Sequence, residues 1–143
     1  SAPRDLPPIW NYRTHRDEFS LYHTLPTFPM YVAYLMLDWV AKEGGIGEMN
    51  HRAKQKAELI YQEIDRNPFL EPLVQKDHRS TVNACFKGKS IEQELKLKSY
   101  LTAQGVMGIQ GFPTKGGFRA SMYNGMPVND VAILVEYLKK FEE

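Results

Sequence analysis

The stretch GGFRASMYNGMP, residues 116–127, decides how the C-terminal part of this 143-residue chain folds. It opens with two glycines, which permit backbone angles that other residues avoid. Apolar and polar side chains then alternate from Phe118 to Tyr123, which predicts a short strand with one buried face. Asn124-Gly125 and Pro127 follow, so we expect the strand to end there in a turn.

Arg119 is the charged residue of this predicted strand. A guanidinium at a partly buried position needs an anionic partner, because an unpaired charge is costly to remove from water. The partner is either an acidic side chain of the same chain or a bound ligand. The spacing alone favours an ion pair within the chain.

Composition limits the classes of protein to consider. The chain is 43% hydrophobic and 24% charged, which is typical of one globular domain. Its net charge of +1 predicts neither a nucleic-acid partner nor an anionic membrane. The longest apolar run, residues 30–37, is too short to span a bilayer. Cys85 is the single cysteine, so we expect a reducing, cytoplasmic location.

The remaining patterns predict an α+β domain. Helices are expected over residues 27–42, 46–66, 91–104 and 128–141, and strands over 80–86, 106–109 and 118–123. Residues 110–115 would join the last two strands in a hairpin, and residues before 27 would be irregular because five prolines lie there or just beyond. The helix over 27–42 is apolar nearly all round, which indicates an interface with another domain or subunit. Together these elements give a three-stranded sheet with helices packed on it.

No pattern of catalytic or metal-ligating residues is present in the sequence. Paired carboxylates, a nucleophile with its base, a glycine-rich phosphate loop and clustered metal ligands are all missing. The chain also begins without a methionine, so we expect a piece of a longer protein.

Residues 116–127 closely resemble the C-terminal signature of the phosphoserine aminotransferases, a family of pyridoxal-phosphate (PLP) enzymes with the fold type I architecture. Three further segments are similar to that family: Leu37-Asp38-Trp39-Val40, Lys56-Ala57-Glu58-Leu59-Ile60-Tyr61 and His78-Arg79-Ser80-Thr81-Val82-Asn83. The likeness covers nearly the whole chain and corresponds to the last part of the family's enzymes. It implies a linker from a large domain over residues 1–26 and a small C-terminal domain over residues 27–143.

The resemblance assigns roles to three residues. Arg119 matches the family arginine that binds the substrate α-carboxylate. His23-Thr24 occupies the place of an Asn-Thr pair that reaches the cofactor phosphate of the neighbouring subunit in a homodimer. The implied reaction exchanges an amino group between glutamate and a phosphorylated 2-keto acid in serine biosynthesis.

Two departures from the family leave alternatives open. Gly111-Phe112-Pro113 stands where the family carries Gly-His-Arg, whose His-Arg pair binds the substrate phosphate, although Lys115 lies nearby. An aminotransferase acting on a non-phosphorylated substrate is therefore the first alternative. The family's catalytic lysine belongs to the preceding large domain, so we expect no catalytic residue, no bound cofactor and no activity in this chain alone. A non-enzymatic domain that dimerises or binds a partner is the second alternative.

Overall fold

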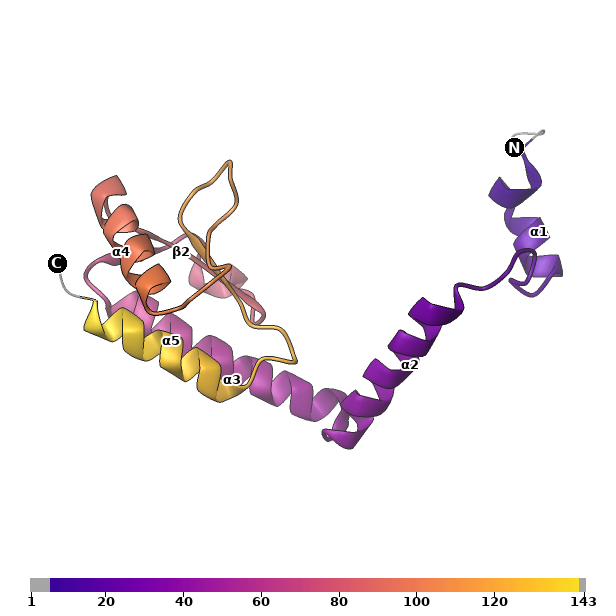
Figure 1. The fold of residues 1–143 in the computed structure, drawn as a ribbon, viewed down its shortest axis with the longest axis horizontal. Coiled ribbons are helices and arrows are strands. Elements are labelled where there is room, and N and C mark those ends of the chain that lie inside the picture. The colour runs from indigo at the N-terminus through magenta and orange to yellow at the C-terminus, as the bar shows by residue number, and fades with distance from the viewer. Residues whose placement is uncertain (1–5, 142–143) are drawn as a thin grey trace. The chain divides into compact units, whose positions relative to one another are not determined.

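The computed structural model describes residues 6–141 and divides into two compact units, Ser1–Lys42 and Glu43–Glu143. Figure 1 shows the ribbon of both, and each unit is described by itself. The boundary between the units follows the helix predicted over residues 27–42. The predicted division at residue 26 into linker and small domain stays a prediction.

The first unit consists of a 3-10 turn and two helices: η1 (Pro8–Trp10), α1 (Tyr12–Asp17) and α2 (Thr27–Lys42). The prediction of irregular structure before residue 27 is wrong for α1. The prolines stand at either side of it, and the side chain of Asn11 caps it by accepting a hydrogen bond from the Arg13 amide at 3.0 Å. The predicted helix over residues 27–42 is confirmed as α2.

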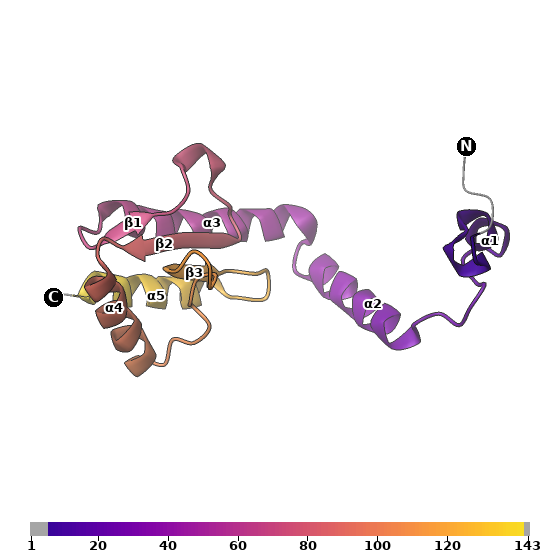
Figure 2. The ribbon, with the colours of Figure 1, turned by 90° about the horizontal axis from the view of Figure 1, so that it is seen from above.

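The second unit contains three helices, one 3-10 turn and a three-stranded sheet. In chain order these are α3 (Gly45–Arg66), β1 (Leu70–Pro72), η2 (Lys76–His78), β2 (Asn83–Gly88), α4 (Ile91–Ala103), β3 (Phe118–Ser121) and α5 (Val128–Lys140). The strands run antiparallel in the order β1-β2-β3. Figure 2 shows the sheet beside α3 and α5. The predicted α+β class and its three-stranded sheet are confirmed.

One of the three predicted strands is wrong. Residues 106–109 form no strand, because Gly108 has a φ of 71° and breaks the extended backbone. The third strand of the sheet is instead β1, which is short and lies at an edge. It contains Pro72, which an edge strand tolerates. The two segments of the predicted hairpin still lie side by side at one point. The Arg119 amide donates to the Ile109 carbonyl at 2.7 Å, and Gln110 forms an isolated antiparallel bridge with Phe118.

The core of the second unit lies between the sheet and the helices. The predicted alternation in β3 is confirmed, because Phe118, Ala120 and Met122 are all 5% exposed or less. Phe86 of β2 is fully buried and its ring stacks on that of Phe118 at 5.3 Å. From the helices the cluster includes Ile60, Ile64, Leu97, Leu101, Val131, Val135 and Leu138.

Ile46, Ile91 and Leu95 lie on the predicted helices of the second unit but do not join this core. Ile46 is 82% exposed because it lies in the first turn of α3, before the buried stripe that begins at Met49. Ile91 and Leu95 of α4 are also exposed, since Leu97 and Leu101 supply the buried face of that helix.

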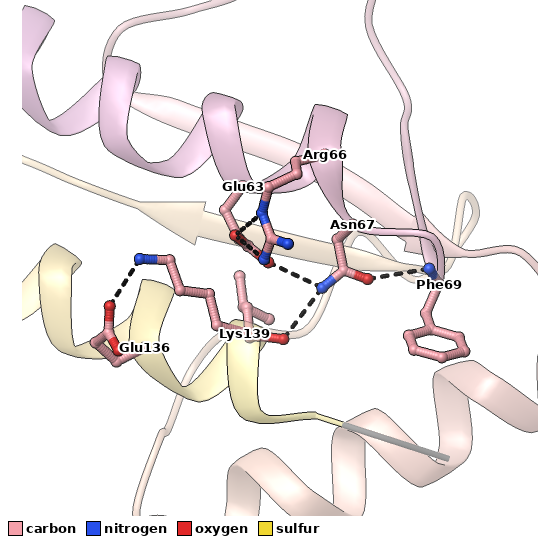
Figure 3. A network of polar contacts seen from close by, with 7 residues as sticks. Glu63, Arg66, Asn67, Phe69, Glu136 and Lys139 are labelled. Carbon is pink, nitrogen blue, oxygen red and sulfur yellow. Dashed lines mark hydrogen bonds and ion pairs between the residues drawn. The ribbon is translucent and has the colours of Figure 1, made fainter.

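A buried polar network joins the C-terminal ends of α3 and α5 (Figure 3). The Asn67 amide nitrogen donates to Glu63 at 2.9 Å and to the carbonyl oxygen of Leu138 at 3.1 Å, while its oxygen accepts from the Phe69 amide at 3.0 Å. Arg66 neutralises the Glu63 carboxylate at 2.8 Å. Asn67 thereby fixes the end of α3 against α5 and against the residues leading into β1.

We predict that Asn67→Ala destabilises the second unit by about 2–3 kcal/mol, because Glu63 and the Leu138 carbonyl oxygen each lose one hydrogen-bond donor and the Phe69 amide loses its acceptor. Urea unfolding followed by circular dichroism measures the loss. Gln62→Ala is the matched control, since Gln62 is exposed and, among residues 6–141, its side chain bonds to Glu58 of its own helix alone. Equal stabilities of the Asn67 and Gln62 variants would contradict the assigned role.

A second ion pair fixes the segment before β2. The Arg79 guanidinium donates to both Asp65 oxygens, at 2.6 and 2.7 Å, and lies 4.6 Å from the centre of the Tyr61 ring. The hydrogen bonds from Arg79 lower the pKa of Asp65. The Asp65 charge therefore stabilises the fold above its unfolded pKa of about 3.9, and this contribution is lost as pH falls through the lower folded value.

Asp65→Asn should accordingly cost stability at pH 7, by about 1 kcal/mol since Asp65 is partly exposed. The difference from the parent chain should remain constant down to about pH 5 and shrink below about pH 4. Urea unfolding at a series of pH values tests this. A difference that does not change between pH 7 and pH 2.5 would show that the Asp65 charge is not what stabilises the pair.

Candidate functional site

Arg119 lies on β3, where its Cα pairs with that of Cys85 on β2. Its neighbours Phe118 and Ala120 face the core, so the alternation of the strand directs Arg119 to the opposite, less buried face. The residue is half-buried, and its Nε atom is removed from solvent. Pairing with β2 thus holds the guanidinium at a defined place on the sheet.

The Arg119 guanidinium has no partner among residues 6–141. No described carboxylate forms an ion pair with it, and its buried Nε has no hydrogen-bond acceptor. The ion pair that spacing alone favours is therefore not found in the described part of the chain. A buried donor without an acceptor indicates a group that is completed by something else.

Arg119 lines a pocket of about 260 Å³. Its other walls come from residues 106–109, residues 120–122, Met126 and the part of α5 between Asp130 and Tyr137. Most of these side chains are apolar, including Met107, Ile133 and Leu134. Asp130 also lines the pocket but forms no ion pair with Arg119 within the described residues. The pocket therefore presents a cation against an apolar wall, which suits a small carboxylate with an organic body.

Lys56 of α3 hydrogen bonds to the turn that follows β3. Its Nζ donates to the carbonyl oxygens of Tyr123 at 2.8 Å and Met126 at 3.0 Å. The side chain is only 1% exposed, and burial lowers the pKa of its ammonium, as the neighbouring Arg52 charge does further. Sequence analysis did not identify Lys56 as a buried residue. Its position three residues after Ala53 and four before Ile60, both buried, was the available signal.

The loop before β3 depends on two glycines. The Gly111 amide donates to the Gly117 carbonyl at 2.9 Å, and a Cβ added at Gly111 would lie 2.0 Å from the Gly116 oxygen. Gly117 has a φ of 66°, and a Cβ there would lie 2.6 Å from the carbonyl oxygen of Phe86. The loop between them extends away from α3 and α5 (Figure 1).

Phe112 and Pro113 are exposed at this loop, with Phe112 at 63%. Lys115, also exposed, forms no ion pair with any described residue. The cation that sequence reasoning assigned to this loop is thus free to meet an anion.

His23 and Thr24 belong to the first unit, whereas Arg119 belongs to the second. Both side chains are exposed, and no described residue hydrogen bonds to either of them. The His23 ring lies edge-on to His15, with centroids 5.9 Å apart, and to Tyr22 at 6.5 Å. The imidazole and the hydroxyl are therefore both available as donors.

Other chemistries find no support in the described residues. Within residues 6–141 no three His, Cys, Asp or Glu side chains gather so that they could hold a metal ion. Over the same residues, no helix has the length and apolar character needed to cross a membrane. Cys85 is a free, half-buried cysteine of β2.

Comparison with known proteins identifies relatives for nearly the whole chain. The family described as Aminotransferase class-V matches residues 5–134. The phosphoserine aminotransferase of Bacteroides thetaiotaomicron is 39% identical over 144 residues, and that of Phocaeicola vulgatus is 40% identical over 143. Both comparisons cover 98% of this chain and 40% of the relative. The chain therefore spans about two fifths of the length of the curated relatives it matches.

Solved structures agree with this assignment. The phosphoserine aminotransferase from Bacillus circulans subsp. alkalophilus matches 97% of this chain and 39% of its own, with a TM-score of 0.88 and 33% identity. A PLP-bound phosphoserine aminotransferase from Trichomonas vaginalis matches 98% of this chain and 40% of its own, with a TM-score of 0.85 and 29% identity. The resemblance inferred from residues 116–127 is thus confirmed, and the chain belongs to the class-V aminotransferase family.

Proposed function

We propose that this chain is the C-terminal part of a PLP-dependent aminotransferase of serine biosynthesis, which exchanges an amino group between glutamate and a phosphorylated 2-keto acid. The observation that carries the proposal is the guanidinium of Arg119, which lies on β3 beside a pocket and has no partner among residues 6–141. The relatives named phosphoserine aminotransferase support the reaction class.

Arg119 would bind the α-carboxylate of the amino acid or keto acid. A guanidinium offers donors in a planar fork that matches a carboxylate in two parallel hydrogen bonds. Because Nε is already out of water and has no acceptor among the described residues, that donor would not have to lose a hydration shell when the carboxylate arrives. The strand holds this end of the substrate still, so that its α-carbon is presented in one orientation.

His23 and Thr24 would hold the cofactor phosphate of the neighbouring subunit in a homodimer. Their exposed and unbonded donors fit a phosphate, which accepts hydrogen bonds from hydroxyl and imidazole groups. PLP, when bound, supplies the electron sink that stabilises a carbanion at the substrate α-carbon. In this proposal the lysine that carries PLP lies outside residues 1–143, so the chain alone binds no cofactor and is inactive. Lys56 is unsuited to that task, because two carbonyl oxygens occupy its ammonium.

The same proposal includes a homodimer in the cytoplasm. It also keeps residues 1–26 as a linker from the preceding domain and 27–143 as the small domain. The exposed apolar side chains of α2, such as Phe28 at 76% and Leu37 at 70%, support an interface with other parts of the complete protein.

The loop before β3 supports a second candidate function, because it has few groups that could bind a substrate phosphate. Phe112 and Pro113 have no group that binds phosphate, and both are exposed on the loop before β3. Lys115 is the cation that this loop offers. If Lys115 does not bind a phosphate, an aminotransferase with a non-phosphorylated substrate is the better hypothesis. The exposed α2 supports the third candidate, a non-enzymatic domain that binds a partner.

We predict that Arg119→Met in the complete protein lowers kcat/KM for glutamate by about 30-fold or more. Loss of a charged hydrogen-bonded partner costs about 2–5 kcal/mol, and each 1.4 kcal/mol is about tenfold. Steady-state kinetics of both half-reactions measure the loss. Lys54→Met is the matched control, since Lys54 is an exposed cation of α3. Unchanged kinetics for Arg119→Met would show that the arginine binds no carboxylate. If the complete parental protein has no aminotransferase activity, the non-enzymatic, partner-binding domain is favoured instead.

Lys115 provides the test of the phosphate. Lys115→Gln should lower kcat/KM for phosphoserine about tenfold, because one charged contact to the phosphate is lost, while the rate with serine changes little. Comparing the two substrates in parental and variant protein gives the ratio. A parental protein that prefers serine, with no effect of Lys115→Gln, would establish the non-phosphorylated substrate.

A further inference from the structure

The least expected feature of the second unit is a buried ammonium with no carboxylate partner in the described part of the chain. Lys56 is 1% exposed, and the partners that the structure gives its Nζ are backbone carbonyl oxygens, those of Tyr123 and Met126. Removing a charge from water is expensive unless it is paired. An apolar side chain of similar length would fill this space at lower cost, so the amine contributes something besides packing.

The two carbonyls that Lys56 binds belong to one turn. The Met126 amide donates to the Tyr123 carbonyl oxygen at 2.9 Å, so this oxygen accepts from both the turn and the lysine. Before the turn, the Met122 amide donates to the Val82 carbonyl oxygen at 2.7 Å and completes the pairing of β3 with β2. Residues 123–127 themselves are exposed, so few packing contacts fix the turn from the solvent side.

This turn contributes to the wall of the pocket that Arg119 lines. Met126 is one of the pocket's walls, and the turn follows β3 directly. Any change in the path of residues 123–126 therefore shifts a wall of the pocket and the end of the strand that carries Arg119. Lys56 lies on α3, 67 and 70 residues away in sequence from the carbonyls that it binds.

We propose that Lys56 is a positioning residue, which holds the turn at residues 123–126 so that Met126 and Arg119 present one fixed site to the substrate carboxylate. The inference rests on the proposed function in one respect, the carboxylate as ligand of Arg119. The ammonium suits the task because it donates to two carbonyls at once from a flexible stem, which an apolar or acidic side chain cannot do.

The test uses nuclear magnetic resonance of the 143-residue chain, with L-glutamate as the probe. Lys56→Met keeps the volume and removes the donors, and Lys54→Met is the control on the same helix. Lys56→Gln, which keeps an N–H donor, serves if Lys56→Met does not fold. The readouts are hydrogen exchange at the Met126 amide, the Nε–H resonance of Arg119, the glutamate dissociation constant and the thermal unfolding midpoint.

We expect Lys56→Met to speed exchange at Met126 at least tenfold, to move the Arg119 Nε–H resonance and to weaken glutamate binding at least fivefold, with Lys54→Met unchanged. A lower unfolding midpoint with unaltered exchange and resonance in the folded chain would overturn the proposal, since Lys56 would then be structural only. If glutamate does not bind the parental chain, carboxylate binding by Arg119 in this chain fails, while exchange at Met126 and the Arg119 resonance still decide the role of Lys56.

Discussion

The pairing of β3 with β2 is the constraint on which the rest of the second unit depends. Phe118 lies opposite Phe86 and Ala120 opposite Ala84, and all four are buried. Because side chains alternate along a strand, this register leaves Arg119 on the other face of the sheet. A slip of one residue would place the guanidinium in the core and Phe118 in solvent. The same contacts that build the core therefore aim the arginine.

The features that the sequence predicts well are those with a local period. The amphipathic stripe of α3, the buried face of α5 and the alternation of β3 each repeat along the chain, so composition at that spacing identifies them. β1 is missed because three residues that include Pro72 are too few to show a period. The apolar side chains of residues 106–109 predict a strand, but Gly108 has a positive φ, which interrupts the extended backbone.

Buried polar residues escape sequence reasoning for a different physical reason. Lys56 and Asn67 both lie at buried positions of the α3 segment, yet each is satisfied by carbonyl oxygens about 70 residues further along the chain. A hydropathy value describes the side chain alone and carries no information about a carbonyl acceptor that is distant in sequence. For the site, the identity of Arg119 follows from the motif. That no residue from 6 to 141 pairs with it depends on the tertiary structure, which the motif does not show. The roles of His23 and Thr24 come from resemblance alone.

The two units differ in what holds them together. All the residues that are buried in the described part of the chain belong to the second unit, which thus carries a core of its own. The first unit buries none of its described residues, although α2 carries Phe28, Tyr31, Tyr34 and Leu37. Helices of this length are marginal in water without tertiary packing. The relatives are about two and a half times as long as this chain, so the proposed preceding domain and partner subunit would provide the missing apolar contacts. We therefore expect the second unit to fold alone, whereas in the proposed complete protein the first unit, with His23 and Thr24, would acquire its order from those contacts.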